Sequence, residues 1–178
     1  IMGFLALLLF WLHAGSLWPK GLYVQILASL FYLTTLSGIV GLIMEKIYPN
    51  LLTRIGHECI YERIPHDIAK IRKKSENLIL ECTEKTGSDT LAKHYLETLG
   101  WFFQRPRFFI NNIFGGRDSY NWVNQQCAIL ERFLNEAESE YLEQLFTLAE
   151  MKIKIDHHYS LQTMLKSWLL VHIPLAAA

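Results

Sequence analysis

Two histidines stand among residues that could lie inside a membrane. His172 belongs to the uncharged run Ser167–Ala178, and His13 follows the apolar run Ile1–Leu12. Ionisable side chains are costly in a bilayer and commonly mark functional sites there. A neutral imidazole at that depth needs a partner for each ring nitrogen, which haem iron and a backbone carbonyl can supply. We therefore predict that His172 and His13 bind a cofactor as ligands of haem iron. For His172 a hydrogen-bonded packing role and a proton relay are the alternatives.

The remaining residues with reactive side chains favour structural roles. Cys59, Cys82 and Cys127 form no C-x-x-C pattern, which excludes a c-type haem attachment site and a zinc knuckle. Each is expected on an apolar helix face as a reduced, buried thiol. The pair His157 and His158 is expected at a membrane interface in a structural role. His57, His66 and His94 are expected on polar faces, and no role is assigned to them.

No motif for hydrolysis or for nucleotide binding occurs in the chain. It contains no G-x-S-x-G, no Walker loop and no G-x-G-x-x-G. The acidic residues Glu138, Glu140 and Glu143 lack the E-x-x-H partner of a carboxylate metal site, so they are expected on a solvated helix face. The sequence therefore names no catalytic residue.

The distribution of charge predicts how the chain is divided between lipid and water. All 17 acidic residues lie between Glu45 and Lys166, and Lys20 is the only one of 17 basic residues outside that range. The uncharged run Leu22–Met44 has the roughly 20 apolar residues that cross a bilayer. The runs at both ends are too short to cross, so we expect the chain to be a piece of a longer membrane protein.

This division predicts five segments. Residues 1–12 would be a truncated transmembrane helix, 13–21 an outer hairpin, and 22–45 a transmembrane helix. Residues 46–158 would form a helical cytoplasmic domain, and 159–178 the start of a further truncated transmembrane helix. The fold class is thus all-α, an integral membrane protein fragment with an inserted helical domain.

Apolar residues in the polar region recur at helical spacing. Helices are expected over Leu51–Ile64, from Pro65 to a stop at Gly87, from Ser88 to Pro106, and over Ser119–Leu134 and Ala137–Ile155. The first of these is amphipathic, and would lie either on the bilayer surface or against the rest of the domain.

The segment "RPRFFINNIFGGRDS" interrupts the helical pattern with Pro, Asn and paired Gly residues, which predict an ordered loop. Its three arginines, Arg105, Arg107 and Arg117, could form a site for phosphate or a lipid headgroup. The favoured interpretation is a loop that aromatic side chains anchor beside the membrane.

The basic residues near the membrane ends predict the orientation. The hairpin carries only Lys20, whereas five basic residues flank the membrane segments on the other side: Lys46, Arg54, Lys152, Lys154 and Lys166. Because Lys and Arg are enriched on the cytoplasmic side, the polar domain is expected there. His172 would then lie about 9 Å inside that face, and His13 near the opposite face. The two would serve two haems, each completed by helices outside this chain.

The C-terminal "SLQTMLKSWLLVHIPLAAA", and more loosely "FWLHAGSLWPKG", resemble bacterial membrane b-type cytochromes related to ferric-reductase-like transmembrane proteins. The resemblance implies haem b on His172 and His13, a multi-pass protein of the bacterial inner membrane, and electron transfer as the membrane subunit of an oxidoreductase. Expected partners are the lipid bilayer, other membrane subunits or missing helices, and a soluble redox protein at the cytoplasmic domain.

A second function fits the same pattern, namely a cofactor-free accessory or scaffolding subunit of a large membrane complex. A sensor would need a kinase or nucleotide motif, which the chain lacks. The polar domain is nearly neutral, with 16 basic and 17 acidic residues, so nucleic acid is not an expected partner.

Overall fold

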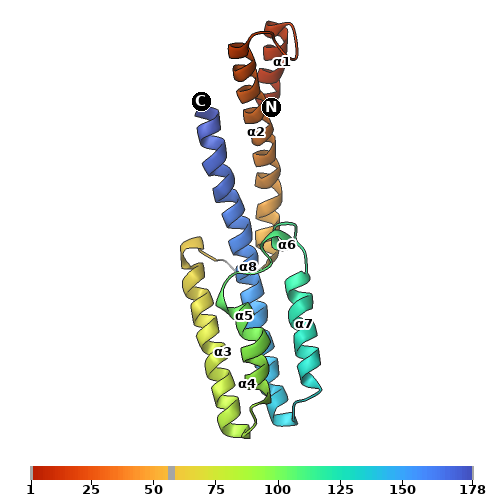
Figure 1. The fold of residues 1–178 in the computed structure, drawn as a ribbon, viewed down its shortest axis with the longest axis vertical. Coiled ribbons are helices and arrows are strands. Elements are labelled where there is room, and N and C mark those ends of the chain that lie inside the picture. Colours follow the sequence, from red (N-terminus) through yellow and green to blue (C-terminus); the bar gives the residue numbers. More distant parts are fainter. Residues whose placement is uncertain (1, 56–58, 178) are drawn as a thin grey trace. The chain divides into compact units, whose positions relative to one another are not determined.

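The computed structural model describes residues 2–55 and 59–177, and every regular element in them is helical. The described part of the chain contains no strand, which confirms the all-α fold class (Figure 1). The elements are α1 (Met2–Ala14), α2 (Leu22–Ile55), the 3-10 turn η1 (Tyr61–Arg63), α3 (Ile64–Thr86), α4 (Thr90–His94), the π-helical turn η2 (Tyr95–Leu99), α5 (Gly100–Gln104), α6 (Phe109–Ile113), α7 (Asp118–Glu131) and α8 (Glu136–Ala177).

The helices form two compact units. The first unit comprises Ile1–Asn50 and Met164–Ala178, and the second comprises Leu51–Thr163. Helices α2 and α8 contribute residues to both units.

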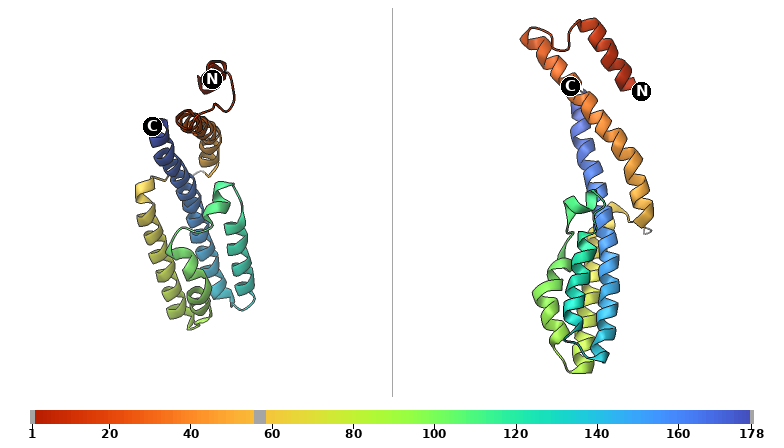
Figure 2. Two further views of the ribbon diagram at one scale, coloured as in Figure 1. Left: turned by 45° about the horizontal axis from the view of Figure 1, so that its top comes forward. Right: turned by 90° about the vertical axis from the view of Figure 1, so that its right-hand side faces the viewer.

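In the first unit, α1 and α2 form an antiparallel hairpin (Figure 2). Aromatic rings join the two helices: Phe10 stacks on Phe31 with ring centroids 4.9 Å apart, and Trp11 Nε1–H donates to the Tyr32 hydroxyl at 3.0 Å. That hydroxyl donates in turn to the carbonyl of Leu17 in the connection, at 2.6 Å. Polar groups of the turn are thus satisfied by the aromatic side chains that pack beside it.

Within the described residues, α2 is the one helix that is long and apolar enough to cross a membrane. Its segment Leu22–Thr53 has a mean hydropathy of 2.0, and only 11% of its most apolar stretch is buried. A core helix of a water-soluble protein would bury most of such a stretch. The apolar part of α1, Leu5–Ala14, is shorter than a span.

The second unit is a helical bundle around one hydrophobic core (Figure 1). Helix α3 contacts α4 and α5, and η2 contacts α7. The rings of Phe102 and Phe103 are fully buried at the centre. Helices α3, α7 and α8 contribute apolar stripes to the same core, including Ile64, Ile68, Ile71, Ile79, Cys82, Val123, Leu130, Leu142, Leu145, Ala149 and Ile153.

The predicted ends of α3 are confirmed by its capping. Pro65 lies in its first turn, where the missing N–H has no helical partner to lose. Gly87 ends the helix in the left-handed region at φ 68°, and its N–H donates to the Thr83 carbonyl at 3.0 Å. Glycine adopts this conformation without steric cost, so the chain can turn there toward α4.

The N-terminus of α8 carries a reciprocal cap that corrects one prediction. The Glu138 N–H donates to Asn135 Oδ1 at 2.8 Å, and the Asn135 N–H donates to Glu138 Oε2 at 3.0 Å. Glu138 is 2% exposed, so it is not part of a solvated face. Glu140 and Glu143 are exposed as expected. Glu138 is buried because the third helical position points back at the cap.

Three helix predictions were wrong in detail. The helix expected over Leu51–Ile64 is not continuous: α2 ends at Ile55, Cys59 and Ile60 are not helical, and the predicted positions Gly56–Glu58, with His57, lie outside the described residues. The helix expected over Ala137–Ile155 does not end there, since α8 continues without interruption into the segment expected to begin at residue 159. No Pro or Gly separates these residues, so nothing interrupts the helix there. The expected loop at 105–119 contains the short helix α6.

Candidate functional site

His172 packs against α2 in the first unit. Its Nδ1 forms a hydrogen bond of 3.0 Å with Ser37 Oγ, and its ring stacks on Trp168 with centroids 4.8 Å apart and planes 13° apart. Trp168 Nε1–H donates to the Ser37 carbonyl at 3.0 Å. The alternative of a hydrogen-bonded packing histidine therefore has a specific geometry, in which two rings of α8 share one serine of α2.

Small residues of α2 make room for these rings. A Cβ built on Gly41 would overlap the indole of Trp168, and one built on Gly38 would lie 3.9 Å from His172 Cε1. A flat macrocycle could approach α2 only where its surface is made of small residues, as at Ser37, Gly38 and Gly41. Trp168 and His172 cover this face, so its residues fit ring packing and leave no room there for a haem.

His13 lies away from this cluster. It occupies the last turn of α1 and is exposed. Since Phe10 packs on Phe31 in the antiparallel hairpin, His13 is displaced from Ser37 by roughly 13 Å along α2 at helical rise. The structure therefore does not bring His13 and His172 together, and no single metal could bind both.

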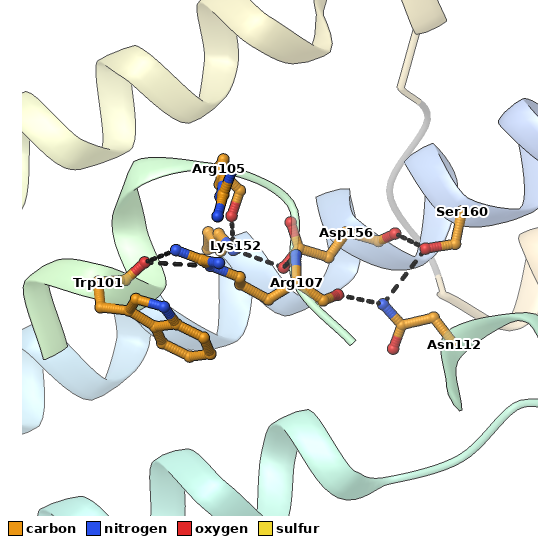
Figure 3. Close-up of polar contacts among 7 residues, drawn as sticks. All are labelled: Trp101, Arg105, Arg107, Asn112, Lys152, Asp156 and Ser160. Atoms are coloured by element: carbon orange, nitrogen blue, oxygen red, sulfur yellow. Dashed lines mark hydrogen bonds and ion pairs between the residues drawn. The ribbon is translucent and has the colours of Figure 1, made fainter. Parts of the chain in front are cut away.

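A second cluster, which the sequence analysis missed, lies in the core of the second unit (Figure 3). Lys152 and Asp156 of α8 are both completely buried and form an ion pair of 2.5 Å between Nζ and Oδ2. Lys152 Nζ also donates to the Arg105 carbonyl at 2.9 Å and lies 4.1 Å from the centroid of the Phe102 ring. Asp156 Oδ1 is buried and has no hydrogen-bond partner among the described residues.

The ion pair holds the segment that follows α5. Asp156 Oδ2 accepts from the Arg107 N–H at 3.2 Å, and the Arg107 carbonyl accepts from Asn112 Nδ2 at 3.0 Å. The Arg107 guanidinium turns back over Trp101, 3.9 Å from the ring centroid, and donates to the Trp101 carbonyl (Figure 3). Phe108 adopts a left-handed φ of 55°, which costs about 1–2 kcal/mol for a residue with a Cβ. These bonds oppose that strain.

Burial shifts both members of the pair toward their neutral forms. Loss of hydration lowers the pKa of Lys152 from 10.5 to about 8, although the charge of Asp156 opposes the change. Loss of hydration likewise raises the pKa of Asp156 from 3.8 to about 6, against the effect of Lys152. Both groups are therefore charged near neutral pH. Asp156 begins to protonate below about pH 6, and Lys152 to deprotonate above about pH 8.

The expected arginine site does not form. Arg107 lies over Trp101, Arg117 lies 5.6 Å from the centroid of Tyr120, and Arg105 is exposed. Part of the aromatic anchoring is present, because Phe108 packs on Trp101 and Trp122 while Phe114 is 83% exposed. Burial, and then the nearby charge of Arg105, lower the pKa of Arg107, whereas Arg117 lies against Tyr120.

The other singled-out residues have structural surroundings. Cys82 is buried, Cys59 and Cys127 are half-buried, and all three are free thiols. Burial raises the pKa of each, for Cys127 to about 11, so none is a reactive thiolate at neutral pH. His158 is 4% exposed, so it is buried within the protein, and its expected position at a membrane interface stays a prediction. His157 is half-buried, and burial lowers its pKa.

A signal for the buried pair was present in the sequence. Leu145, Ala149 and Ile153 recur at helical spacing as an apolar face of the expected helix Ala137–Ile155. Positions 152 and 156 fall beside this face, at spacings of three and seven from Ala149. Lys152 was instead counted among the basic residues near the membrane. Opposite charges four residues apart on an inward face indicate a buried pair.

Comparisons of the chain with known protein families, with curated proteins and with solved structures found no match. Function must therefore be argued from the sites themselves.

Replacement of one partner of the ion pair should destabilise the protein far more than replacement of both. We expect Lys152→Met to lower the free energy of unfolding by about 3–5 kcal/mol, because Asp156 would remain buried without a counter-charge. The double variant Lys152→Met/Asp156→Leu should lose much less. Urea unfolding of the intact chain in detergent, followed by circular dichroism, measures both. Equal losses in the single and double variants would contradict a desolvated pair.

The same pair predicts a pH dependence of stability. Between about pH 8 and 10.5 the folded chain has lost the Lys152 proton that the unfolded chain keeps, so the free energy of unfolding rises with pH. Between about pH 6 and 3.8 the folded chain holds a proton on Asp156 that the unfolded chain lacks, so the free energy of unfolding rises as the pH falls. The stability of wild type minus that of the double variant should therefore be lowest near neutral pH. If the difference in stability between wild type and the double variant does not change with pH, the pKa shifts of Lys152 and Asp156 are refuted.

Proposed function

We propose that this chain is a cofactor-free membrane-anchoring subunit, or part of one, within a larger membrane assembly. In this proposal α2 and the C-terminal part of α8 pack as a helix pair in the bilayer. The helical bundle of the second unit provides the surface that other components bind. The single observation that carries the proposal is the packing of Trp168 and His172 on Ser37, Gly38 and Gly41.

The polar groups of this helix pair support a membrane setting. The indole N–H of Trp168 and Nδ1 of His172 both find partners on Ser37, and the Thr34 hydroxyl lies 3.1 Å from the Leu175 carbonyl. In hydrocarbon, polar side chains join helices because no water competes for their hydrogen bonds. Small residues beside large rings bring the helices close, as in many membrane helix pairs.

The outward face of α2 offers an apolar surface to lipid or to further helices. Leu33, Leu36, Val40 and Ile43 recur at spacings of three and four and are 38–61% exposed. On α8 the exposed apolar residues include Leu170 and Val171. A water-soluble protein would leave no such surface uncovered. We therefore propose the bilayer and other membrane subunits as partners.

The electron-transfer hypothesis stays a prediction. One support is the resemblance of the C-terminal segment to membrane b-type cytochromes. A second is the hydrogen bond between His172 Nδ1 and Ser37, because a metal-ligating histidine uses one ring nitrogen for such a bond and the other, here Nε2, for the metal. Against it, the Ser37–Gly41 face is filled by rings. A haem b on His172 would therefore have to bind away from this face of α2.

Absorption spectroscopy separates the two functions. In the full-length protein, purified in detergent, we expect no b-type α-band in the dithionite-reduced minus oxidised spectrum. Gly41→Leu should lower the free energy of unfolding by about 1–3 kcal/mol, because its side chain would overlap Trp168. Val40→Leu, an exposed change on the same helix, is the control and should have little effect. A sharp α-band that His172→Ala removes would contradict the proposal and support electron transfer.

The proposed orientation places the second unit in the cytoplasm. Lys152 does not contribute to the excess of basic residues that predicts this orientation, because its side chain is buried. Lys46, Lys154 and Lys166 are exposed and do contribute. Protease added to sealed inside-out vesicles should cleave within residues 51–163, whereas protease outside intact cells should not. Cleavage in intact cells alone would show the opposite orientation. Detection with an antibody against the second unit gives the fragment sizes.

A further inference from the structure

Helix α6 of the second unit turns a polar side chain inward and apolar side chains outward. Asn112 is completely buried, and its Nδ2 donates to the Arg107 carbonyl at 3.0 Å and to Ser160 Oγ of α8 at 3.4 Å. By contrast, Ile110 is 73% exposed, and Phe114, directly after the helix, is 83% exposed. Because residues four apart share a helix face, these two side chains form one outward apolar surface. A helix that faces water has the opposite arrangement.

A third exposed apolar residue, Ile60, lies at the same end of the bundle. Ile60 is 58% exposed, and the next residue, Tyr61, stacks on Tyr159 of α8 with ring centroids 5.8 Å apart. Thr163 Oγ1 donates to the Tyr61 hydroxyl at 3.1 Å. The other contact of Tyr159 is with Phe109 of α6, edge-on at 6.4 Å. Figure 1 likewise shows α6 and the start of α3 at one end of the bundle, and the turns after α3 and α7 at the other.

We propose that Ile60, Ile110 and Phe114, which we call the end surface, insert into the headgroup region of a lipid bilayer. The end surface would hold this end of the bundle on the membrane. The proposal rests on the anchoring function, because it requires the chain to lie in a membrane, and it adds a contact with lipid that the apolar helix pair does not make.

The chain connections of the second unit favour lipid as the partner. Its boundary residues, Leu51 and Thr163, both lie at this end: Leu51 Cδ2 is 4.0 Å from a Cβ built on Gly115, and Thr163 binds the Tyr61 hydroxyl. The uncharged run of α8 starts at Ser167, four residues after Thr163, which is a rise of about 6 Å in a helix. The headgroup layer on each side of a bilayer core is about 5–8 Å thick. A helix that enters the core at Ser167 therefore has Thr163 within that layer.

The residue types at this end fit the headgroup layer. Tyr61 and Tyr159 each combine an apolar ring with a polar hydroxyl, which is typical of the aromatic belts at membrane interfaces. The end surface itself consists of apolar side chains, whose transfer out of water is favourable. An amphipathic helix at an interface lies in its plane with the apolar side toward the acyl chains. Helix α6 is too short to be stable by itself, so the bonds of Asn112 fix its orientation.

The test is methyl NMR on the full chain, with one chain in each phosphatidylcholine nanodisc and two relaxation agents. One agent is phosphatidylcholine with a nitroxide near its headgroup, and the other is a water-soluble gadolinium chelate. The lipid nitroxide should broaden the methyl signals of Ile60 and Ile110 about threefold more than that of Ile129, and the chelate should broaden Ile129 more.

Ile129 is the matched control because it is an exposed isoleucine far from the end surface. It is 43% exposed and lies eleven residues after Asp118, the first residue of α7. Asp118 Oδ2 accepts from Asn111 Nδ2 of α6 at 2.6 Å, so α7 starts beside α6 and Ile129 is about 16 Å further along the helix.

Ile43 separates a failure of this proposal from a failure of the anchoring function. It is 52% exposed on α2, near the end of the uncharged run, so the lipid nitroxide broadens its methyl signal if α2 lies in the bilayer. Broadening of Ile43 without broadening of Ile60 and Ile110 would overturn the end surface and keep the anchoring function. Absence of lipid broadening at all three residues would overturn both.

A charge within the end surface should weaken its insertion. Phe114→Asp changes an exposed side chain, so the core stays intact, and it should lower the broadening of Ile110 by the lipid nitroxide about twofold. Phe133→Asp, a change at a 71% exposed position after α7, should leave that broadening unchanged. Equal lipid broadening of Ile110 in Phe114→Asp and wild type would overturn the proposal. Chelate broadening of Ile110 as strong as that of Ile129 would also overturn it, and would favour a protein partner for the end surface.

Discussion

The second unit depends on one buried charge pair. Lys152 and Asp156 are fully shielded from water. Lys152 Nζ and Asp156 Oδ2 bond to each other and to the backbone of residues 105–107, whereas Asp156 Oδ1 has no partner among the described residues. Two isolated charges at these positions would be too costly to bury. The chain after α5 must therefore pass over α8 at this place, since its carbonyl and N–H groups complete the bonds of the pair. The left-handed Phe108 and the turn of Arg107 over Trp101 follow from that path.

The first unit is organised by size rather than by charge. Ser37, Gly38 and Gly41 leave a shallow surface on α2, and Trp168 and His172 are the side chains that cover it. One serine satisfies both rings, through its hydroxyl and its carbonyl. The histidine that first suggested a redox centre thus packs on α2 with a specific geometry, and this packing is why we favour an anchoring role.

Anchoring uses the packing of rings on small residues of α2. Of the arginines that the sequence suggested as one headgroup site, Arg105 and Arg107 are neighbours, and Arg117 lies against Tyr120. Arg105 also lines a groove with Arg72, which lies 33 positions earlier in the chain.

The sequence by itself determined the helical class, the apolar segment of α2 and most helix ends. Apolar periodicity, Pro65 and Gly87 act through local geometry, so they can be read without knowing the fold. The tertiary structure alone decided which side chains meet across the bundle. Lys152 was taken for a surface charge and Glu138 for a solvated one, because burial of a charge depends on partners supplied by distant segments. The backbone of residues 105–107, for example, reaches Lys152 and Asp156 from more than 45 positions away, and no local pattern records that contact.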